Sequence, residues 1–360
     1  MPELFLTIFF ISILLIFLGT GIWVALSMVG VSAIGMLLFT SRPVGDAMAT
    51  TIWGTSSSWT LTALPLFVWM GEILFRTKLS ENLFKGLAPW MSRLPGGLVH
   101  VNVVGCALFA AISGSSAATV ATVGKMSIPE LRKRNYPEKL LLGSLAGSGT
   151  LGLLIPPSII LIIYGVTVQE SIAKLFIAGI IPGIMIAIFF MFYVIGWSVL
   201  NKDSMPKTEE TFSFSQKMKD SGQLIPVIVL IAAVIGSIYV GIATATEAAS
   251  LGVVGALILS FFQKSLNKET FKLSLLGATK TSCMIAFILA GSSFLSLAMG
   301  FTGLPRGLAI WIQEMNLSPY VLILVLTIFY IILGMFLDGI SAVVLTMAII
   351  EPMIRQAGFD

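Results

Sequence analysis

Long apolar stretches separated by short polar or glycine-bearing joints run through the whole of this 360-residue chain. A helix needs about 20 apolar residues to cross a membrane. The pattern therefore predicts an all-α chain that crosses a membrane many times. The apolar segments run at roughly 4–18, 22–40, 52–75, 97–112, 116–128, 140–165, 172–199, 224–240, 245–262, 276–300, 319–337 and 340–354.

The composition agrees with this prediction and excludes several classes of function. Hydrophobic residues make up 57% of the chain and charged residues only 11%, whereas about a quarter of a soluble domain is charged. His100 is the sole histidine, and Cys106 and Cys283 lie in separate apolar segments, so we expect neither a metal centre nor a disulfide framework. A net charge of +4 does not indicate binding of nucleic acid.

The most polar stretch, residues 201–223, divides the chain into two halves that resemble each other. Gly114 and Gly339 lie 225 positions apart, as do Ser116 and Ser341. The same spacing relates the short polar stretches that separate the apolar segments in the two halves. We therefore predict a first repeat at 1–200, a cytoplasmic linker at 201–223 and a second repeat at 224–360.

Each half contains a pair of short apolar segments joined by a polar, glycine-bearing tip. Residues 97–128 surround the sequence SGSS, and residues 319–354 surround Asp338 and Gly339. We interpret each pair as a re-entrant hairpin, because non-helical backbone at membrane depth is tolerated where it is buried in protein or lines a wet cavity. The alternative is two ordinary crossings with a tight turn.

The positive charges favour the hairpin interpretation. If the hairpins do not cross, seventeen of the 21 Lys and Arg residues fall on one side, which the positive-inside rule makes cytoplasmic. This places the N-terminus in the periplasm. Five crossings then separate the starts of the repeats, so the second repeat is inverted, and inverted repeats place their binding sites near the midplane. The four opposite charges are Arg42, Lys174, Arg306 and Arg355.

The segment 140–165 has the pattern of a broken helix. Four glycines and the pair Pro156-Pro157 interrupt the sequence GSLAGSGTLGLLIPPSIILIIYG. Proline lacks the N–H that a helix needs, so carbonyls before Pro156 lose their partners, which is costly in a membrane unless something binds them. A sodium ion would do so, because hard cations prefer oxygen ligands. A plain proline kink is the alternative.

The tip of the first hairpin offers complementary chemistry. Ser113, Ser115 and Ser116 place three hydroxyls around a glycine, between the end of one helix and the start of another. Hydroxyls and carbonyls suit sodium, and the free N–H groups of a helix start suit an anionic substrate. Small residues that let helices pack closely are the alternative. A hairpin tip and a broken helix in one repeat favour a shared site.

Several stretches together resemble one family. SGSSAATVATVG, GSGTLGLLIPPSIILIIYGV and LFIAGIIPG are similar to the large membrane subunit of tripartite ATP-independent periplasmic (TRAP) transporters, as are LPLFVWMGEIL, SRLPGG, ATATEAA and FLDGIS. The resemblance implies an elevator-type secondary transporter of the bacterial inner membrane, not an enzyme. It also implies sodium-driven import of a dicarboxylate, a sialic or sugar acid or a keto acid. Its partners would be a periplasmic solute-binding protein and a small four-helix membrane subunit, with Na⁺ as coupling ion and no cofactor.

The resemblance also assigns roles to residues. The first sodium site would use Ser113, Ser115, Gly152, Ile155 and the region of Pro157, the second would use Gly334, Asp338 and Gly339, and the substrate would meet Ser115, Ser116, Thr150 and Ser341. One feature departs from the family pattern. The counterpart of Pro156 would lie near position 381, beyond Asp360, so we expect the second broken helix and the C-terminal end of the subunit to be missing.

Two other functions compete with this interpretation. An intramembrane aspartyl protease needs two facing acids, and only Asp338 is deeply embedded. A sodium-coupled organic-anion transporter could work without a binding protein. Among the acids, Asp338 is the best functional candidate because a buried carboxylate is costly, with a structural cap as its alternative. Glu72 and Arg76 are expected to form an interfacial ion pair, and Glu247 to complement a helix dipole.

Overall fold

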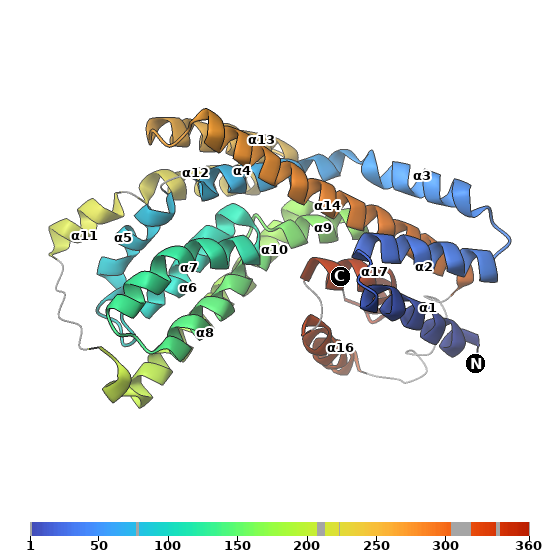
Figure 1. The fold of residues 1–360 in the computed structure, drawn as a ribbon, viewed down its shortest axis with the longest axis horizontal. Coiled ribbons are helices and arrows are strands. Elements are labelled where there is room, and N and C mark those ends of the chain that lie inside the picture. Colours follow the sequence, from blue (N-terminus) through green and yellow to red (C-terminus); the bar gives the residue numbers. More distant parts are fainter. Residues whose placement is uncertain are drawn as a thin grey trace. The chain divides into compact units, whose positions relative to one another are not determined.

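The fold is given by a computed structural model, which describes residues 2–76, 79–206, 213–222, 224–303, 318–335 and 339–359. Within these ranges every regular element is a helix, as the apolar pattern predicts. The chain forms two compact units (Figure 1). Unit 1 comprises residues 1–61, 163–170 and 283–360, and unit 2 comprises residues 62–162 and 171–282. We describe each unit by itself.

Unit 2 is built around the first predicted hairpin. The two arms of this hairpin, α6 (Val99–Ser113) and α7 (Ser116–Lys133), lie side by side, and α8 (Glu138–Gly149) packs along α6 (Figure 1). The buried Asn102 amide of α6 donates to the Leu141 carbonyl at 3.2 Å and to the Ser144 hydroxyl at 3.0 Å, which ties α6 to α8. The helices of this unit are α4 (Ala63–Phe75), α5 (Leu79–Met91), α6 (Val99–Ser113), α7 (Ser116–Lys133), α8 (Glu138–Gly149), η2 (Thr150–Leu153), the start of α9 (Ile159–Val168), α10 (Ile172–Leu200), η3 (Lys202–Ser204), α11 (Phe214–Ser221), α12 (Ile225–Tyr239), α13 (Ala245–Phe262) and the first part of α14 (Lys268–Thr302).

Unit 1 holds the second predicted hairpin. The arms α16 (Pro319–Gly334) and α17 (Gly339–Gln356) pack together, with the Tyr330 and Thr346 hydroxyls 2.7 Å apart. The Ser292 hydroxyl of α14 donates to the Val344 carbonyl of α17 at 2.7 Å. The other helices that begin in this unit are α1 (Pro2–Gly19), α2 (Val24–Phe39), α3 (Val44–Ser56) and η1 (Trp59–Thr62), and the arms are α16 (Pro319–Gly334) and α17 (Gly339–Gln356).

Several helices have the length and composition of membrane spans. Three of those described, α10, α13 and α14, are long and apolar enough to cross a membrane by themselves. Two bent pairs, α3 with η1–α4 and α11 with α12, pass the same test together, which brings the total to five. On α10, large apolar side chains such as Ile181 and Phe192 are exposed, as expected of a helix that faces lipid.

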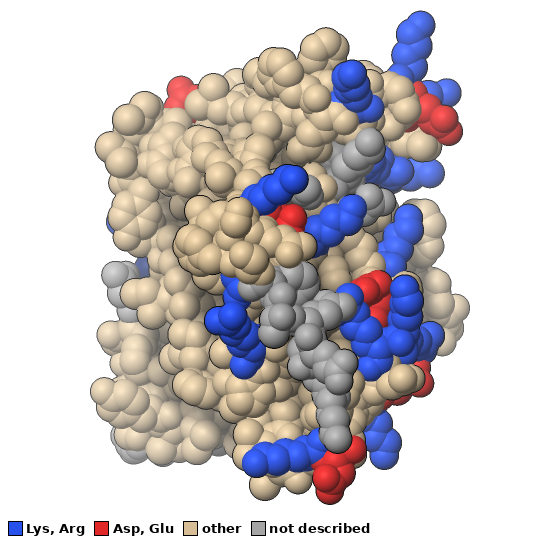
Figure 2. All heavy atoms as spheres, turned by 90° about the vertical axis from the view of Figure 1, so that its left-hand side faces the viewer, with Lys and Arg blue, Asp and Glu red and all other residues tan. Residues whose placement is uncertain are grey.

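The basic side chains gather in unit 2. All of the predicted cytoplasmic Lys and Arg residues that the structure describes belong to this unit. Figure 2 shows Lys and Arg side chains concentrated on the face that α11 and its neighbours present. A single basic face is what the positive-inside rule requires of one membrane side. That this side is cytoplasmic stays a prediction.

The compact units do not follow the boundaries of the predicted repeats. Each unit combines residues from both the 1–200 and the 224–360 segments. The units show which helices pack together, but they do not compare the first half of the chain with the second. The inverted repeats therefore stay a prediction. Two local expectations are confirmed. Glu247 forms a capping box with Thr244 at the start of α13, and Glu72 pairs with Arg76.

Candidate functional site

The sequence SGSS forms the joint between the two arms of the first hairpin. Gly114 ends α6 in the left-handed conformation (φ 58°), which glycine adopts without the strain of a side chain. Its N–H donates to the Ala110 carbonyl at 3.0 Å. Ser115 is the N-cap of α7, and its hydroxyl accepts from the Ala118 N–H at 3.5 Å. The four residues therefore stop one helix and start the next.

The Ser113 hydroxyl has a defined set of partners at this joint. It lies 3.0 Å from the Thr119 hydroxyl and accepts from the Ser115 N–H at 3.3 Å. Thr119 donates to the Ser115 carbonyl at 2.7 Å, and the Ser113 hydroxyl is within donating distance of the same carbonyl, at 3.3 Å. A hydroxyl has one hydrogen and two lone pairs. The Ser113 oxygen therefore takes part in a compact hydrogen-bond network at the hairpin tip, where a cation could replace one of its partners.

The predicted broken helix is interrupted between η2 and α9. The peptide bond between Pro156 and Pro157 is cis. The Ser158 hydroxyl donates to the Leu153 carbonyl at 2.5 Å, which replaces the N–H that Pro157 lacks. The Leu153 carbonyl therefore lacks a backbone donor at the break and accepts a hydrogen bond from the Ser158 side chain instead.

Two other carbonyls at the break lose their helical partners. The Gly152 carbonyl would pair with the N–H of Pro156, which has none. The Ile155 carbonyl would pair with the Ile159 N–H, but that group donates instead to the Gly114 carbonyl at the hairpin tip, at 3.3 Å. Both are the carbonyls that the resemblance assigns to the first sodium site. The bond from Ile159 joins the broken helix directly to the hairpin.

Glycines allow the backbone segments to approach this closely. A Cβ on Gly152 would lie 2.8 Å from the Ser115 carbonyl carbon, and a Cβ on Gly114 would lie 2.8 Å from the Pro157 carbonyl oxygen. A Cβ on Gly71 of α4 would lie 3.0 Å from the Ser113 Cα. Contacts below 3.0 Å cannot be accommodated without movement of the backbone. The structure thus brings together Ser113, Ser115, Gly152 and the residues around Pro157.

A cavity of about 230 Å³ opens beside the hairpin tip. Ser113 and Ser115 contribute hydroxyls to it, and Glu72 contributes a carboxylate. The sequence pattern predicts only an ion pair for Glu72, because no spacing along the chain relates residue 72 to residue 113. The lining residues are Val68, Gly71, Glu72, Phe75, Ser113, Ser115, Ala118, Ile159 and Thr281.

The other predicted residues lie in two places. Ser116 is the first residue of α7, and Thr150 is exposed, with its hydroxyl bonded to the Gly147 carbonyl at 2.7 Å. The second-site residues belong to unit 1. Gly334 ends α16, Gly339 begins α17, Ser341 is buried on α17, and Asp338 lies outside the described residues.

Unit 1 contains a larger polar cavity that the sequence pattern does not predict. Its volume is about 550 Å³, within the range of small-molecule sites. Hydroxyls of Ser58, Thr167 and Ser293 line it together with Glu170, which pairs with Arg355 at 2.8 Å. A signal was present in the runs GTSSSWT and GSSFLS, whose hydroxyl-bearing residues interrupt apolar segments. Neither run includes a proline or a charge to mark it.

Together, the apolar helices, the interrupted helix and the oxygen-rich hairpin tip define a membrane transport protein. The family model described as "Tripartite ATP-independent periplasmic transporter, DctM component" matches residues 9–360, and the chain belongs to this family. It is 31% identical to the C4-dicarboxylate TRAP transporter large permease protein DctM of Pseudomonas aeruginosa, over 91% of this chain and 76% of the relative.

The names of other relatives include other substrates. The chain is 29% identical to the isethionate TRAP transporter permease protein DctMQ of Oleidesulfovibrio alaskensis, over 96% of this chain and 54% of the relative. It is also 29% identical to the sialic acid TRAP transporter large permease protein SiaM of Vibrio cholerae, over 95% and 80%. These names describe permeases of transporters, which agrees with the prediction of a transport protein.

Proposed function

We propose that this chain is the large permease subunit of a TRAP transporter that uses a sodium gradient to import a small organic acid across the bacterial inner membrane. Membership in the family supports secondary transport. The relatives are named for a C4-dicarboxylate, isethionate and sialic acid, which are all organic acids. We propose a periplasmic binding protein and a small membrane subunit as partners, in line with the family's tripartite organisation.

The observation that carries the sodium assignment is the hydrogen bond from the Ile159 N–H to the Gly114 carbonyl. Because of this bond, the Ile155 carbonyl has no helical donor, and Pro156 deprives the Gly152 carbonyl in the same way. Together with the hydroxyls of Ser113 and Ser115, they supply neutral oxygens of the kind that hard cations prefer. A cation here would compensate the cost of leaving these oxygens unpaired.

The remaining assignments extend this proposal by symmetry. Gly334, Asp338 and Gly339 would form a second sodium site in the second repeat. Ser115, Ser116 and Thr150 of unit 2 and, separately, Ser341 of unit 1 are proposed to contact substrate, because helix starts offer N–H groups to an anion. The two hairpins and the broken helix would move together in an elevator motion that carries the site between the membrane faces.

Transport by the assembled complex tests the proposal. The chain, its small subunit and its binding protein are reconstituted in liposomes, and uptake of labelled C4-dicarboxylate, isethionate and sialic acid is followed. We expect accumulation of one of these acids under an inward sodium gradient, and loss of accumulation when potassium replaces sodium. Equal accumulation in potassium would contradict sodium coupling.

Omission of the binding protein separates the proposal from its nearest rival. A sodium-coupled transporter that works alone would take up substrate at the same rate without the soluble component. We expect uptake to fall to the level of empty liposomes. Undiminished uptake would favour the rival and would leave sodium coupling intact.

A further inference from the structure

Glu72 brings a negative charge to the cavity beside the hairpin tip. Its side chain is 24% exposed and lines the same cavity as Ser113 and Ser115. Of the described residues that line this cavity, Glu72 alone carries an ionisable group. The oxygens of Ser113, Gly152 and Ile155 are all neutral. A cation loses its hydration when it binds to these neutral oxygens, and this is costly unless a negative charge lies nearby. Glu72 can supply that charge.

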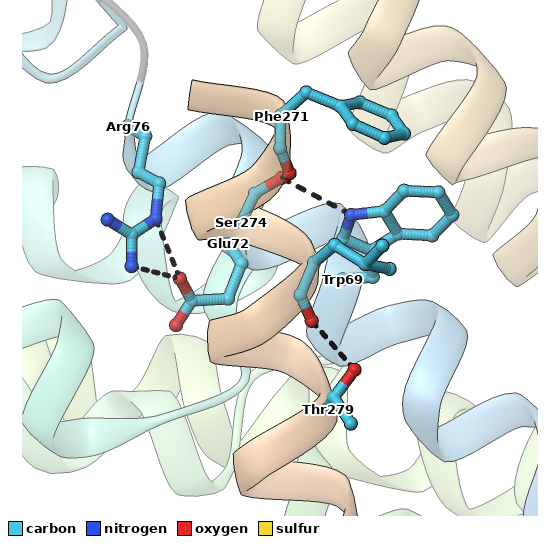
Figure 3. Close-up of polar contacts among 7 residues, drawn as sticks. Trp69, Glu72, Arg76, Phe271, Ser274 and Thr279 are labelled. Atoms are coloured by element: carbon cyan, nitrogen blue, oxygen red, sulfur yellow. Dashed lines mark hydrogen bonds and ion pairs between the residues drawn. The ribbon is translucent and has the colours of Figure 1, made fainter. Parts of the chain in front are cut away.

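The packing of α4 fixes where this carboxylate lies. On one flank, Gly71 packs against Ser113. On the other flank, Gly277 of α14 leaves room for the carboxylate, because a Cβ there would lie 2.6 Å from the Glu72 Oε2 atom. Figure 3 shows Glu72 and Arg76 on one side of α14 and Trp69 on the other. Trp69 holds α4 to α14 by donating to the Ser274 hydroxyl at 3.3 Å.

Arg76 engages only one oxygen of this carboxylate. Its Nε and Nη2 atoms lie 3.1 Å and 3.0 Å from the Glu72 Oε2 atom. No donor in the described part of the chain reaches Oε1. Partly exposed ion pairs four residues apart on a helix contribute little to stability. An interaction this weak can be displaced by a second cation that approaches through the cavity.

We propose that Glu72 is the counter-charge of the cation bound at the hairpin tip, and that Arg76 competes with this cation for the same carboxylate. Without the cation, Arg76 neutralises Glu72. When the cation binds, the carboxylate is shared, and the ion pair with Arg76 weakens. This inference rests on the proposed sodium site at Ser113, and it adds to that site a charge and an internal competitor.

Sodium binding by substituted proteins tests this inference. The complex of the chain with its small subunit is purified in detergent, and binding of ²²Na⁺ and the sodium-dependent rise in melting temperature are measured. We expect Glu72→Gln to weaken sodium binding tenfold or more. We expect Arg76→Gln to tighten sodium binding several-fold, because it removes the competitor. A purely structural ion pair predicts loss of stability in both variants and tighter binding in neither.

A second ion pair of the same spacing provides the matched control. Glu130 and Arg134 on α7 lie 2.7 Å apart with similar exposure, and neither lines the cavity. Glu130→Gln should leave sodium affinity unchanged. Should Glu72→Gln fail to fold, the Arg76→Gln variant decides alone, and unchanged or weaker sodium binding in it would overturn the inference.

The failure of this inference can be told from the failure of the proposed function. Ser113→Ala is measured in parallel. If Ser113→Ala weakens sodium binding while Glu72→Gln binds as the unsubstituted protein does, the sodium site stands and the role of Glu72 is wrong. If the unsubstituted protein binds no sodium, or Ser113→Ala binds it unchanged, the proposed site itself is wrong.

Discussion

Two glycines close together in sequence show how differently single residues can matter in this chain. Gly143 and Gly152 belong to the same glycine-rich stretch and look alike in the sequence. A Cβ on Gly143 would have no atom within 4 Å, whereas a Cβ on Gly152 would lie 2.8–3.0 Å from backbone atoms of Ser115 and Ser116. Of these two positions, only 152 requires glycine, because the backbone there lies against the backbone of Ser115 and Ser116.

We therefore predict opposite effects of alanine at the two positions. Gly152→Ala should separate the hairpin tip from the broken helix, with a loss of about 1–3 kcal/mol of stability from overpacking and weaker sodium binding. Gly143→Ala lies inside α8 and should stabilise the protein by up to about 1 kcal/mol. Thermal unfolding of the purified complex, with and without sodium, measures both effects. Equal melting temperatures for the two variants would contradict the close approach.

At the level of elements, the sequence predicted the parts of the site better than their arrangement. Proline chemistry alone predicts an interruption near Pro156, and the apolar pattern predicts the arms around SGSS. The bond from Ile159 to Gly114 joins residues 45 positions apart, and no local pattern specifies such a pairing. Likewise, Glu72 looks like an ordinary helical ion-pair partner until packing places it beside Ser113.

For Asp338, the sequence makes a prediction that the structure does not test. The cost of a carboxylate in a membrane makes it a functional candidate from sequence alone, but it lies outside the residues that the structure describes. The polar cavity of unit 1 was missed because its lining combines three separate segments, each carrying only two or three hydroxyl or amide side chains. Such sites emerge only when folding brings the segments together.

For the whole molecule, the distribution of charge predicts the sidedness of the membrane protein. Lys133 and Ser204 are exposed in unit 2, among the residues predicted to be cytoplasmic. In a background without Cys106 and Cys283, a cysteine at either position should react with a membrane-impermeant reagent only from the cytoplasm. A cysteine at Arg42 should react only from the periplasm. Periplasmic labelling at Lys133 would end the re-entrant hairpin model, and the inverted repeat with it.

The sodium dependence of uptake by Ser113→Ala tests the central claim most directly. Alanine fits wherever serine does, so the variant removes an oxygen ligand with little change in packing. The loss of such an interaction costs about 1–3 kcal/mol, and the sodium concentration for half-maximal uptake should rise several-fold or more. Ser127→Ala, at a buried serine of α7, is the control and should behave as the unsubstituted complex does. An unchanged sodium dependence in Ser113→Ala would show that SGSS is a packing motif and not an ion site.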